Sequence, residues 1–509
     1  MPPEHEVAGS NPAGRTKLSG TVTPSAASEI AMTKFLSAIF VLCAATAFAQ
    51  APLDAKKLAA IDEFVNHEMA RQRIPGLELG IYSRGRILLA KGYGLANIEL
   101  NAPVKPETLM QAGSVGKQFV SFAIMMLVEE GKISLDDSIA KFFPDAPPSW
   151  KPILIRNLLS HTSGLAEYET PERTGPNGPF YYRLDFTEDE LAKKIEALPI
   201  EFAPGEKWDY RNTNYALLGI IIHKITGAPY AEFLDARIFK PLGMTSTRPI
   251  SDRDIIPNRA AGYEIDRNGE IRNQEWVSPT FNSTADGTLY FNVLDIAHWD
   301  GALYGTKLLT QSSLERLWSV YPLNDGKPNE AGYGFGWMTA AQNGHKLIEH
   351  GGAWQGFTCR ISRYPDDNLT VAVLTNLEAG YSNPREIAHV VAGLVNPALT
   401  VPKLEAVADD HPELAQRLRK FLDEIVAGTD VRSEVTPQLA ARMTPEAMKG
   451  AQHALAKLWP GGTIVLVRKS PDVRWYRLSK GSEVALVVFG LGADGKIATF
   501  TRLPNREYQ

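Results

Sequence analysis

The first regular pattern of hydrophobic and polar positions is that of an amphipathic helix. Between Leu53 and Arg71, apolar residues recur every three or four positions, which predicts a helix with one buried face. Two apolar runs follow at 77–82 and 87–91, separated by the turn-forming residues 83–86. Runs of this length around a short polar turn predict a β-hairpin.

The densest apolar segment begins just after Ser114. It predicts a helix that is buried on most sides, with residues 114–117 at its N-terminal end. Ser114 and Lys117 are three residues apart, so their side chains share one face of that helix. The apolar positions are Phe119, Val120, Phe122, Ala123, Met126, Leu127 and Val128.

This spacing has a chemical consequence. A serine hydroxyl needs a base to take its proton, and a lysine can be that base only if its pKa falls. Burial disfavours the ammonium form, and the positive end of the helix dipole acts in the same direction. Ser114 and Lys117 therefore predict an acylation device, although an N-cap serine followed by a surface lysine has the same pattern.

A second polar group lies at Trp208–Gly219, which reads WDYRNTNYALLG. Tyr210 and Asn212 are two residues apart, so they lie on the same side of a predicted extended segment, which precedes an apolar helix at 215–225. A tyrosine can accept and return a proton if nearby cations lower its pKa, and an asparagine amide can hold a substrate carbonyl. Taken alone, the two residues also fit a polar junction between a loop and a helix.

A third group is the stretch IEHGGAWQGF at Ile348–Phe357, which precedes two predicted strands at 358–363 and 369–374. Gly351 and Gly352 would let a substrate approach the backbone of an edge strand, where an unpaired N–H can bind an oxyanion. Taken alone, the stretch also fits a glycine-rich strand entry with an incidental histidine.

His161, in the segment SHTSGL at 160–165, is a candidate base. We favour the simpler interpretation that this segment is a helix end capped by local hydroxyl groups.

The three groups occur in the order S-V-G-K, Y-R-N and H-G-G. They resemble the three signatures of the serine β-lactamase and penicillin-binding protein superfamily, in the branch that holds class C β-lactamases, D-alanyl-D-alanine carboxypeptidases and related esterases. The segments at 158–165, 287–299 and 333–337 also look like that family, and the similarity covers about 55–400. It implies an α/β (α+β) fold in which helices flank a central antiparallel sheet.

The resemblance also implies a role for each matching residue. Ser114 would be the acylated nucleophile and Lys117 its proton acceptor. Tyr210 would relay the proton to the leaving group and help to activate the deacylating water. Asn212 would orient the substrate amide, and the N–H groups of Ser114 and Ala353 would form the oxyanion hole.

The chain departs from the family pattern at His350, where a lysine is common. Histidine is largely uncharged near neutral pH, and Gly351 lacks the hydroxyl of the usual threonine, while Gly352 matches the pattern. The resemblance therefore supports acyl transfer from an ester, an amide or a β-lactam more firmly than antibiotic hydrolysis. It implies a small-molecule or peptide substrate and neither a cofactor nor a metal.

Two alternatives bear on this function. Ala112, Ser114 and Gly116 nearly match the G-x-S-x-G nucleophile elbow, but residues 107–113 make a poor buried strand, so we set that fold aside. The other is a protein that binds penicillin or a cell-wall fragment without turnover. The serine, lysine and tyrosine together argue against it, because a receptor needs no base beside its hydroxyl.

A composition shift after Asn396 predicts a linker, so we expect the hydrolase domain to span 50–400 and a smaller α+β domain to span 404–509. The smaller domain is similar to nuclear transport factor 2-like modules. Aromatic residues there could line a pocket, although core packing explains them more simply. These aromatic residues are Trp459, Trp475 and Tyr476. The elements predicted for this domain are helices at 412–428 and 445–458 and strands at 463–468, 473–478, 483–489 and 497–503.

The N-terminal residues are unlike the rest. Residues 1–31 show no apolar periodicity and predict either disorder or an over-extended reading frame. Residues 32–49 carry a lysine, an apolar run and an A-x-A site, which predicts a signal peptide and hence a periplasmic or secreted protein. An uncleaved membrane anchor is the alternative; after cleavage no stretch is long enough to span a membrane.

Overall composition adds a few limits. The chain has 509 residues, of which 44% are hydrophobic and 22% charged, as in soluble globular proteins with more than one domain. A formal net charge of -5 gives no reason to expect nucleic acid as a partner. Only two cysteines occur, Cys43 and Cys359, so no disulfide framework is predicted. The oligomeric state stays open.

Overall fold

The structure is a computed structural model that describes residues 53–266, 268–481, 483–504 and 508. The predicted leader at 1–31 and the predicted signal peptide at 32–49 lie outside the described residues. Over the residues that are described, no helix has both the length and the apolar character that crossing a membrane requires.

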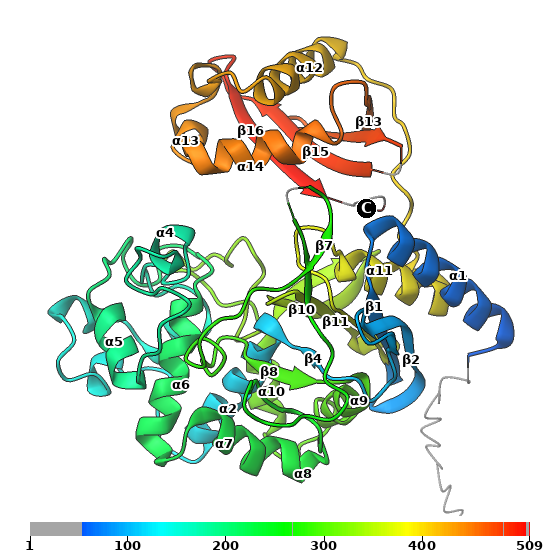
Figure 1. Cartoon of the computed structure of the whole chain (residues 1–509). Helices are drawn as coiled ribbons and strands as arrows, with labels where there is room; N and C mark the ends of the chain where they lie inside the picture. The colour runs from blue at the N-terminus through cyan, green and yellow to red at the C-terminus, as the bar shows by residue number, and fades with distance from the viewer. Residues whose placement is uncertain (1–52, 267, 482, 505–507, 509) are drawn as a thin grey trace, which may run out of the picture. The chain divides into compact units, whose positions relative to one another are not determined.

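A seven-stranded antiparallel sheet organises the first part of the chain (Figure 1). Its strand order is β3-β2-β1-β12-β11-β10-β9, so the chain leaves the sheet after β3 and returns at β9. The predicted hairpin and the two predicted strands after residue 357 are confirmed. The strands are β1 (Gly76–Ser83), β2 (Arg86–Asn97), β3 (Ala102–Pro103), β9 (Met338–Gln342), β10 (His345–Trp354), β11 (Phe357–Tyr364) and β12 (Leu369–Thr375).

The central strand β12 is apolar along most of its length because both faces of the sheet are covered. Val371 and Val373 pack in one core with residues of α1 (Ala55–Gln72) and α11 (Pro384–Val395). Alternate residues of the same strand, Ala372 and Leu374, belong to a second core on the other face. Side chains of a strand alternate between faces, so a strand between two layers has no polar side.

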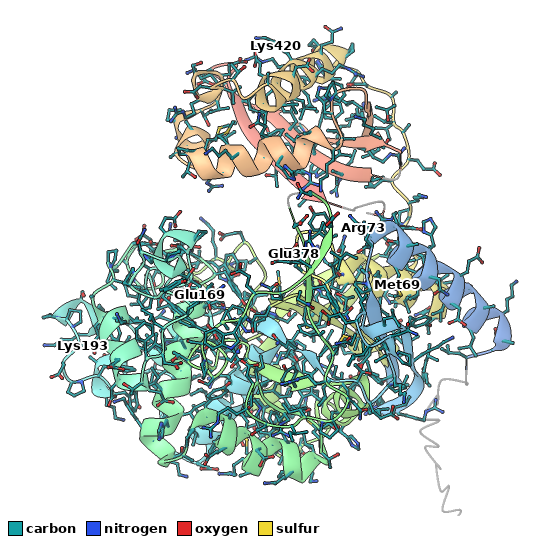
Figure 2. All side chains as sticks on the ribbon, in the orientation of Figure 1. Met69, Arg73, Glu169, Lys193, Glu378 and Lys420 are labelled. Carbon is teal, nitrogen blue, oxygen red and sulfur yellow. The ribbon has the colours of Figure 1, made fainter. Side chains whose placement is uncertain are left out.

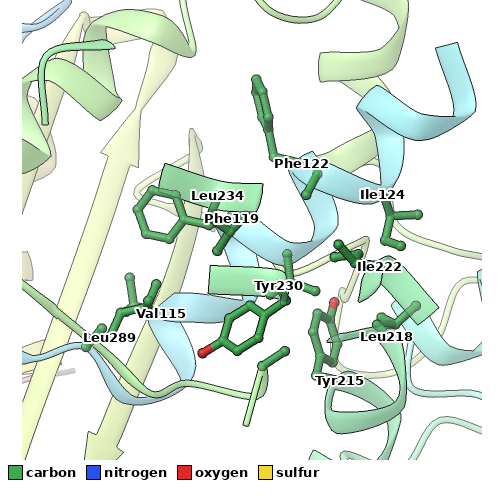
Figure 3. Packing of buried hydrophobic residues seen from close by; sticks show 14 of the residues in the cluster. Val115, Phe119, Phe122, Ile124, Tyr215, Leu218, Ile222, Tyr230, Leu234 and Leu289 are labelled. Atoms are coloured by element: carbon green, nitrogen blue, oxygen red, sulfur yellow. The ribbon is translucent and has the colours of Figure 1, made fainter. Parts of the chain in front are cut away.

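The second core is built around α2 (Lys117–Glu129), which follows the short helix η1 (Gly113–Gly116). Residues 117–127 are all buried, as the sequence predicts. Figure 3 shows Phe119 and Phe122 of α2 in the same cluster as Tyr215, Leu218 and Ile222 of α6 (Asn212–Thr226). The buried helix α2 therefore fixes the position of the residues at its N-terminal end.

Helix α6 begins at Asn212, three residues before the predicted helix. The carboxylate of Glu167 accepts the backbone N–H of Asn212 at 2.5 Å, and a carboxylate at a helix N-terminus is favoured by the unpaired N–H groups there. This acceptor comes from a distant segment, so the local pattern does not contain it.

The remaining elements of this part are short. The helices are α3 (Ile155–Leu159), α4 (Pro171–Thr174), α5 (Glu188–Glu196), α7 (Tyr230–Leu234), α8 (Lys240–Leu242), α9 (Val293–Ala302) and α10 (Gln311–Trp318). The strands are β4 (Met110–Gln111), β5 (Arg248–Pro249), β6 (Tyr263–Ile265), β7 (Ile271–Asn273) and β8 (Leu289–Phe291).

The C-terminal residues form a sheet of their own, in the order β13-β14-β15-β16, with every neighbouring pair antiparallel. Helices and strands share one core, in which Trp459 and Tyr476 are buried. The likeness to nuclear transport factor 2-like modules stays a prediction. The elements are α12 (Pro412–Val426), α13 (Pro437–Ala440), α14 (Pro445–Ala456), β13 (Thr463–Lys469), β14 (Arg474–Lys480), β15 (Glu483–Leu491) and β16 (Ile497–Pro504).

Candidate active site

The structure brings the three predicted motifs together around Ser114. Two cavities meet at this serine: the smaller is also lined by Asn212 and Ala353, and the larger by Tyr210. The amine of Lys117 is hydrogen-bonded to Ser114. The larger cavity has a volume of about 410 Å³ and is also lined by His350, Gly351, Gly352 and Ala353.

Lys117 is fully buried and its amine is in hydrogen-bond contact with the serine. Its Nζ donates to Ser114 Oγ at 2.9 Å and to Asn212 Oδ1 at 2.9 Å, and it also donates to the carbonyl oxygen of Asp286. Burial lowers the pKa of Lys117 to about 8, against the attraction of nearby carboxylates, of which Asp286 is the strongest. The surface-lysine interpretation is therefore wrong, and an unprotonated amine is accessible near neutral pH.

Two glycines let the serine segment lie directly against the sheet. A Cβ on Gly352 would be 1.9 Å from the carbonyl oxygen of Ala112 and 2.9 Å from the nitrogen of Ser114. A Cβ on Gly113, which has φ +48°, would be 2.3 Å from the nitrogen of Ala353. These contacts place the backbone nitrogens of Ser114 and Ala353 beside one cavity, as an oxyanion hole requires.

The strand that carries these residues is open on one side. β9 pairs with β10 only from His345 to Glu349, while β11 pairs with it from Ile348 to Trp354. Over the described residues, the stretch 350–354 is therefore paired on the β11 side alone and has one open edge, as predicted from its glycines, along which an extended substrate can lie.

Tyr210 is half-buried beside the serine, but its electrostatics differ from the sequence-based reasoning. Burial raises the pKa of Tyr210, and the nearby Ser114 hydroxyl lowers it by less. Lys117 Nζ is 5.0 Å from the centre of the phenol ring. Among the described residues the Tyr210 hydroxyl has no partner in hydrogen-bond geometry. The resting protein therefore holds a neutral phenol, whose hydroxyl is available to a substrate.

His350 is held as a neutral imidazole. Its Nδ1 donates to the carbonyl oxygen of Gly351 at 2.6 Å, so Nε2 accepts from the hydroxyl of Tyr333 at 3.0 Å. Burial and, next, Lys117 lower the pKa of His350 to about 3, in line with the expectation of an uncharged side chain. Sequence reasoning did not assign a role to Tyr333, although the segment at 333–337 was noticed.

Two arginines reach the larger cavity, which the sequence did not predict. Arg360 and Arg385 line it, and both form ion pairs with the buried Glu349. A Cβ on Gly351 would be 2.9 Å from Nη1 of Arg360. The cavity thus contains positive charge, supplied by residues other than His350.

His161 lies much closer to the site than a simple helix end would suggest. The helix end itself is confirmed, since α3 stops at Leu159 and the Ser160 hydroxyl donates to a carbonyl of its last turn. His161, however, is fully buried with φ +58°. Its Nδ1 accepts the backbone N–H of Arg211 at 3.2 Å, and its ring lies 4.2 Å from that of Tyr210.

A group of carboxyls near Lys117 also escaped sequence reasoning. Glu169 Oε2 accepts from Asn212 Nδ2 at 2.6 Å, and Asp286 accepts from the hydroxyl of Tyr168 at 2.6 Å. Glu167 caps α6, as described above. The acids come from two segments more than a hundred residues apart, and no spacing in the sequence connects them. Within the described ranges, no histidine, cysteine or carboxylate side chains gather in an arrangement that could hold a metal ion.

Comparison with known proteins gives the family. Residues 61–395, more than half of the chain, match the Beta-lactamase family. The chain is 31% identical over 313 residues to penicillin-binding protein 4* of Bacillus subtilis (strain 168), covering 58% of this chain and 66% of that protein. It therefore spans about two thirds of the length of that relative.

Solved structures show the same fold. The octameric penicillin-binding protein homologue from Pyrococcus abyssi superimposes with a TM-score of 0.60 at 24% identity, covering 88% of this chain and 96% of that one. The D-amino acid amidase from Ochrobactrum anthropi superimposes with a TM-score of 0.57 at 25% identity, covering 68% and 99%. The chain belongs to the Beta-lactamase family.

Proposed function

We propose that the protein is an exported serine hydrolase that acts on an ester, amide or β-lactam bond through a covalent acyl-enzyme. The observation that carries this proposal is the contact between Nζ of the fully buried Lys117 and Ser114 Oγ, at 2.9 Å. A buried amine whose pKa is lowered to about 8 is a base matched to a serine hydroxyl.

In the acylation step, Lys117 takes the Ser114 proton as Oγ attacks the carbonyl carbon. The oxygen of that carbonyl becomes an oxyanion, which the N–H groups of Ser114 and Ala353 stabilise by roughly 3 kcal/mol each. The proton then passes from Lys117, by way of the Tyr210 hydroxyl, to the leaving group as its bond to carbon breaks. Asn212, held against Lys117, orients the substrate amide.

Deacylation follows the same steps, with water in place of the leaving group. Water loses a proton to the same relay, attacks the ester carbonyl and releases the acid, while Ser114 regains its proton. Because Tyr210 is a neutral phenol in the resting protein, it passes protons on rather than storing a negative charge.

Relatives support this range of bonds. The D-amino acid amidase from Ochrobactrum anthropi is named for an amide substrate, and penicillin-binding protein 4* for binding penicillin. Export rests on the predicted signal peptide at 32–49.

The test uses the purified mature protein and its Ser114→Ala variant. Each is given a chromogenic cephalosporin, a short-chain nitrophenyl ester and a D-Ala-D-Ala peptide, and turnover is followed beside labelling by a fluorophosphonate. We expect turnover and labelling to require Ser114. Turnover that survives the substitution would remove Ser114 from its role, and labelling without product release would favour the binding protein instead.

The rate should depend on pH through Lys117. The active form is the neutral amine, so we expect kcat/KM to rise with pH and level off above about 8. His350 adds no ionisation near neutral pH because its pKa is about 3. Initial rates of ester hydrolysis between pH 5 and 9.5, corrected for spontaneous hydrolysis, measure this profile. A rise centred near pH 6 would point to a histidine as the base.

His161 should position Tyr210 through its ring. Asparagine tolerates a positive φ and keeps an acceptor near the place of Nδ1, but it removes the ring. We therefore expect His161→Asn to fold, to lower kcat by roughly 10- to 100-fold because the phenol shifts, and to leave KM within about threefold.

His161→Phe is the complementary variant, since it keeps a ring but not the acceptor for the N–H of Arg211. Steady-state kinetics of both variants, with thermal unfolding as a check, separates the two contacts. An unchanged kcat in His161→Asn would contradict the positioning role.

A further inference from the structure

Both nitrogens of the His350 imidazole already have partners within the protein. Nδ1 donates to the carbonyl oxygen of Gly351 at 2.6 Å, and Nε2 accepts from the hydroxyl of Tyr333 at 3.0 Å. A neutral imidazole has one donor and one acceptor, so this side chain keeps no free polar atom for a substrate. The ring lines the larger cavity beside Ser114, but its hydrogen bonds support the protein itself.

Tyr333 is a rigidly held donor. Side chains fill the interior between the helices and the sheet (Figure 2), and Tyr333 is fully buried. Its backbone N–H donates to Asn329 Oδ1 at 2.9 Å, and its carbonyl oxygen accepts from Asn329 Nδ2 at 2.8 Å. Its ring centre lies 4.8 Å from that of His161 and 5.6 Å from that of His350. Because the hydroxyl donates to Nε2, it selects the tautomer of His350 that carries its proton on Nδ1.

The segment that carries Tyr333 also lies against the helix that carries Lys117. A Cβ on Gly336 would be 2.8 Å from the carbonyl oxygen of Lys117 and 2.8 Å from Ser121 Oγ, both in α2. Tyr333 is therefore fixed relative to α2. Its hydrogen bond to His350 connects that helix with β10.

The other end of this connection is a part of β10 with unusual backbone freedom. Gly351 and Gly352 precede Ala353, and glycine has more conformational freedom than any other residue. Beyond Glu349, β11 alone pairs with this stretch among the described residues. A hydrogen bond to the Gly351 carbonyl restrains the peptide group between the two glycines. It thereby limits the movement of the N–H of Ala353, which comes next.

We propose that Tyr333 is a positioning residue for the oxyanion hole. Its hydroxyl holds His350, whose imidazole holds the Gly351 carbonyl. The N–H of Ala353, two residues further on, then stays where the oxyanion forms. This inference rests on the proposed function and gives His350 a supporting role instead of a contact with the substrate. A preorganised donor stabilises the charge that develops in the transition state, so loss of the support should lower kcat more than it raises KM.

Tyr333→Phe removes the hydroxyl and keeps the ring. Complete removal of an oxyanion donor costs roughly 100- to 1000-fold in kcat, so a donor that is only less well held should cost roughly 10-fold. We expect that fall in kcat for the short-chain nitrophenyl ester, with KM changed by less than about threefold.

Tyr364→Phe is the matched control. The Tyr364 hydroxyl is also buried and donates to Gln342 Oε1 at 2.8 Å, but Tyr364 lines neither cavity beside Ser114. This variant should lose a similar amount of stability in thermal unfolding, about 1 kcal/mol, and its kcat should stay within about twofold of wild type. An equal fall of kcat in both variants would overturn the proposal, because loss of any buried hydroxyl would then have the same effect.

Two variants of equal shape test the hydrogen bond to Gly351. Asparagine and leucine have the same shape, but only asparagine has a donor near the position of Nδ1. We expect His350→Leu to lower kcat by roughly 10- to 100-fold and His350→Asn to recover most of that loss. In the His350→Asn protein, Tyr333→Phe should change kcat by less than about twofold, because Nε2 is gone. Equal rates in His350→Asn and His350→Leu, or a full effect of Tyr333→Phe in the His350→Asn protein, would contradict the proposal.

Magnetic resonance of the Ser114→Ala protein, with histidine labelled by heavy nitrogen, separates this inference from the proposed function because it needs no turnover. Loss of signals in His350→Asn identifies those of His350. We expect Nδ1 to carry the proton, and the Nε2 signal to move when Tyr333→Phe is added. A proton on Nε2 overturns the inference even if ester hydrolysis depends on Ser114. Failure of the proposed function would appear instead as turnover that survives Ser114→Ala while Nδ1 carries the proton.

Discussion

Replacing Lys117 by methionine is expected to slow acylation of Ser114 on the order of 10³-fold while the protein stays folded. The amine is the group that takes the serine proton, and the described structure places its nitrogen 2.9 Å from Ser114 Oγ. Methionine has a similar length and volume, so the site keeps its shape. Labelling by a fluorophosphonate, followed by mass spectrometry over time, measures the acylation rate directly.

The thermal stability of Lys117→Met should change much less than its activity. A buried amine is costly to desolvate, and replacing a buried charge by an apolar side chain is often neutral or stabilising by about 1–4 kcal/mol. The lost hydrogen bonds to Asn212 and Asp286 offset part of that gain. We expect the midpoint of thermal unfolding to move by only a few degrees.

Lys141→Met is the control for this prediction. That lysine is exposed, with 56% side-chain accessibility in an ion pair with Asp137, and its replacement should leave acylation unchanged. Rapid labelling of Lys117→Met would show that another base serves Ser114.

Gly352→Ala should also lower activity strongly, for a steric reason. The new Cβ would lie 1.9 Å from the carbonyl oxygen of Ala112 and 2.9 Å from the nitrogen of Ser114, and neither backbone atom can rotate away. The edge of β10 must move away from Ser114, which separates the two oxyanion donors. A displacement of about 1 Å can reduce the rate roughly 100-fold, and overpacking costs about 1–3 kcal/mol of stability.

Gly351→Ala gives the comparison at the neighbouring position. Its Cβ would meet Nη1 of Arg360 at 2.9 Å, the end of a side chain that can shift. We expect a loss in kcat/KM of less than about tenfold, since the serine segment is not displaced. Kinetics with the short-chain nitrophenyl ester and thermal unfolding of both variants test the pair. Similar losses in the two would mean that the close approach at Gly352 is not what holds the oxyanion hole.

Many of the helices and strands could be predicted because the sequence patterns that indicate them are local. The buried helix after Ser114, the hairpin at the start of the sheet and the strands after residue 357 each follow from periodicity within a few residues. The start of α6 could not be placed, because Glu167 supplies its cap from a distant segment. The three motifs were found because each occupies a short run, and the resemblance joined them into one site.

Other parts of the site have no local signal. Tyr333 contacts His350, Arg360 reaches the larger cavity and the ring of His161 lies against that of Tyr210 only after the middle of the chain folds against the sheet. The helix-end explanation for the segment at 160–165 was correct for the backbone but did not reveal where the imidazole lies. The same holds for the carboxyls near Lys117, which come from separate loops.

The amino-acid sequence alone indicated which side chains could do chemistry: a hydroxyl, an amine and a phenol. The two backbone N–H groups of the oxyanion hole were implied by the family resemblance. Only the tertiary structure decided the charge of these side chains. Burial among segments that lie up to 169 residues apart lowers the pKa of Lys117 to about 8 and keeps the phenol of Tyr210 protonated. Ionisation depends on the solvent and the charges within a few ångströms, and those neighbours are set by packing.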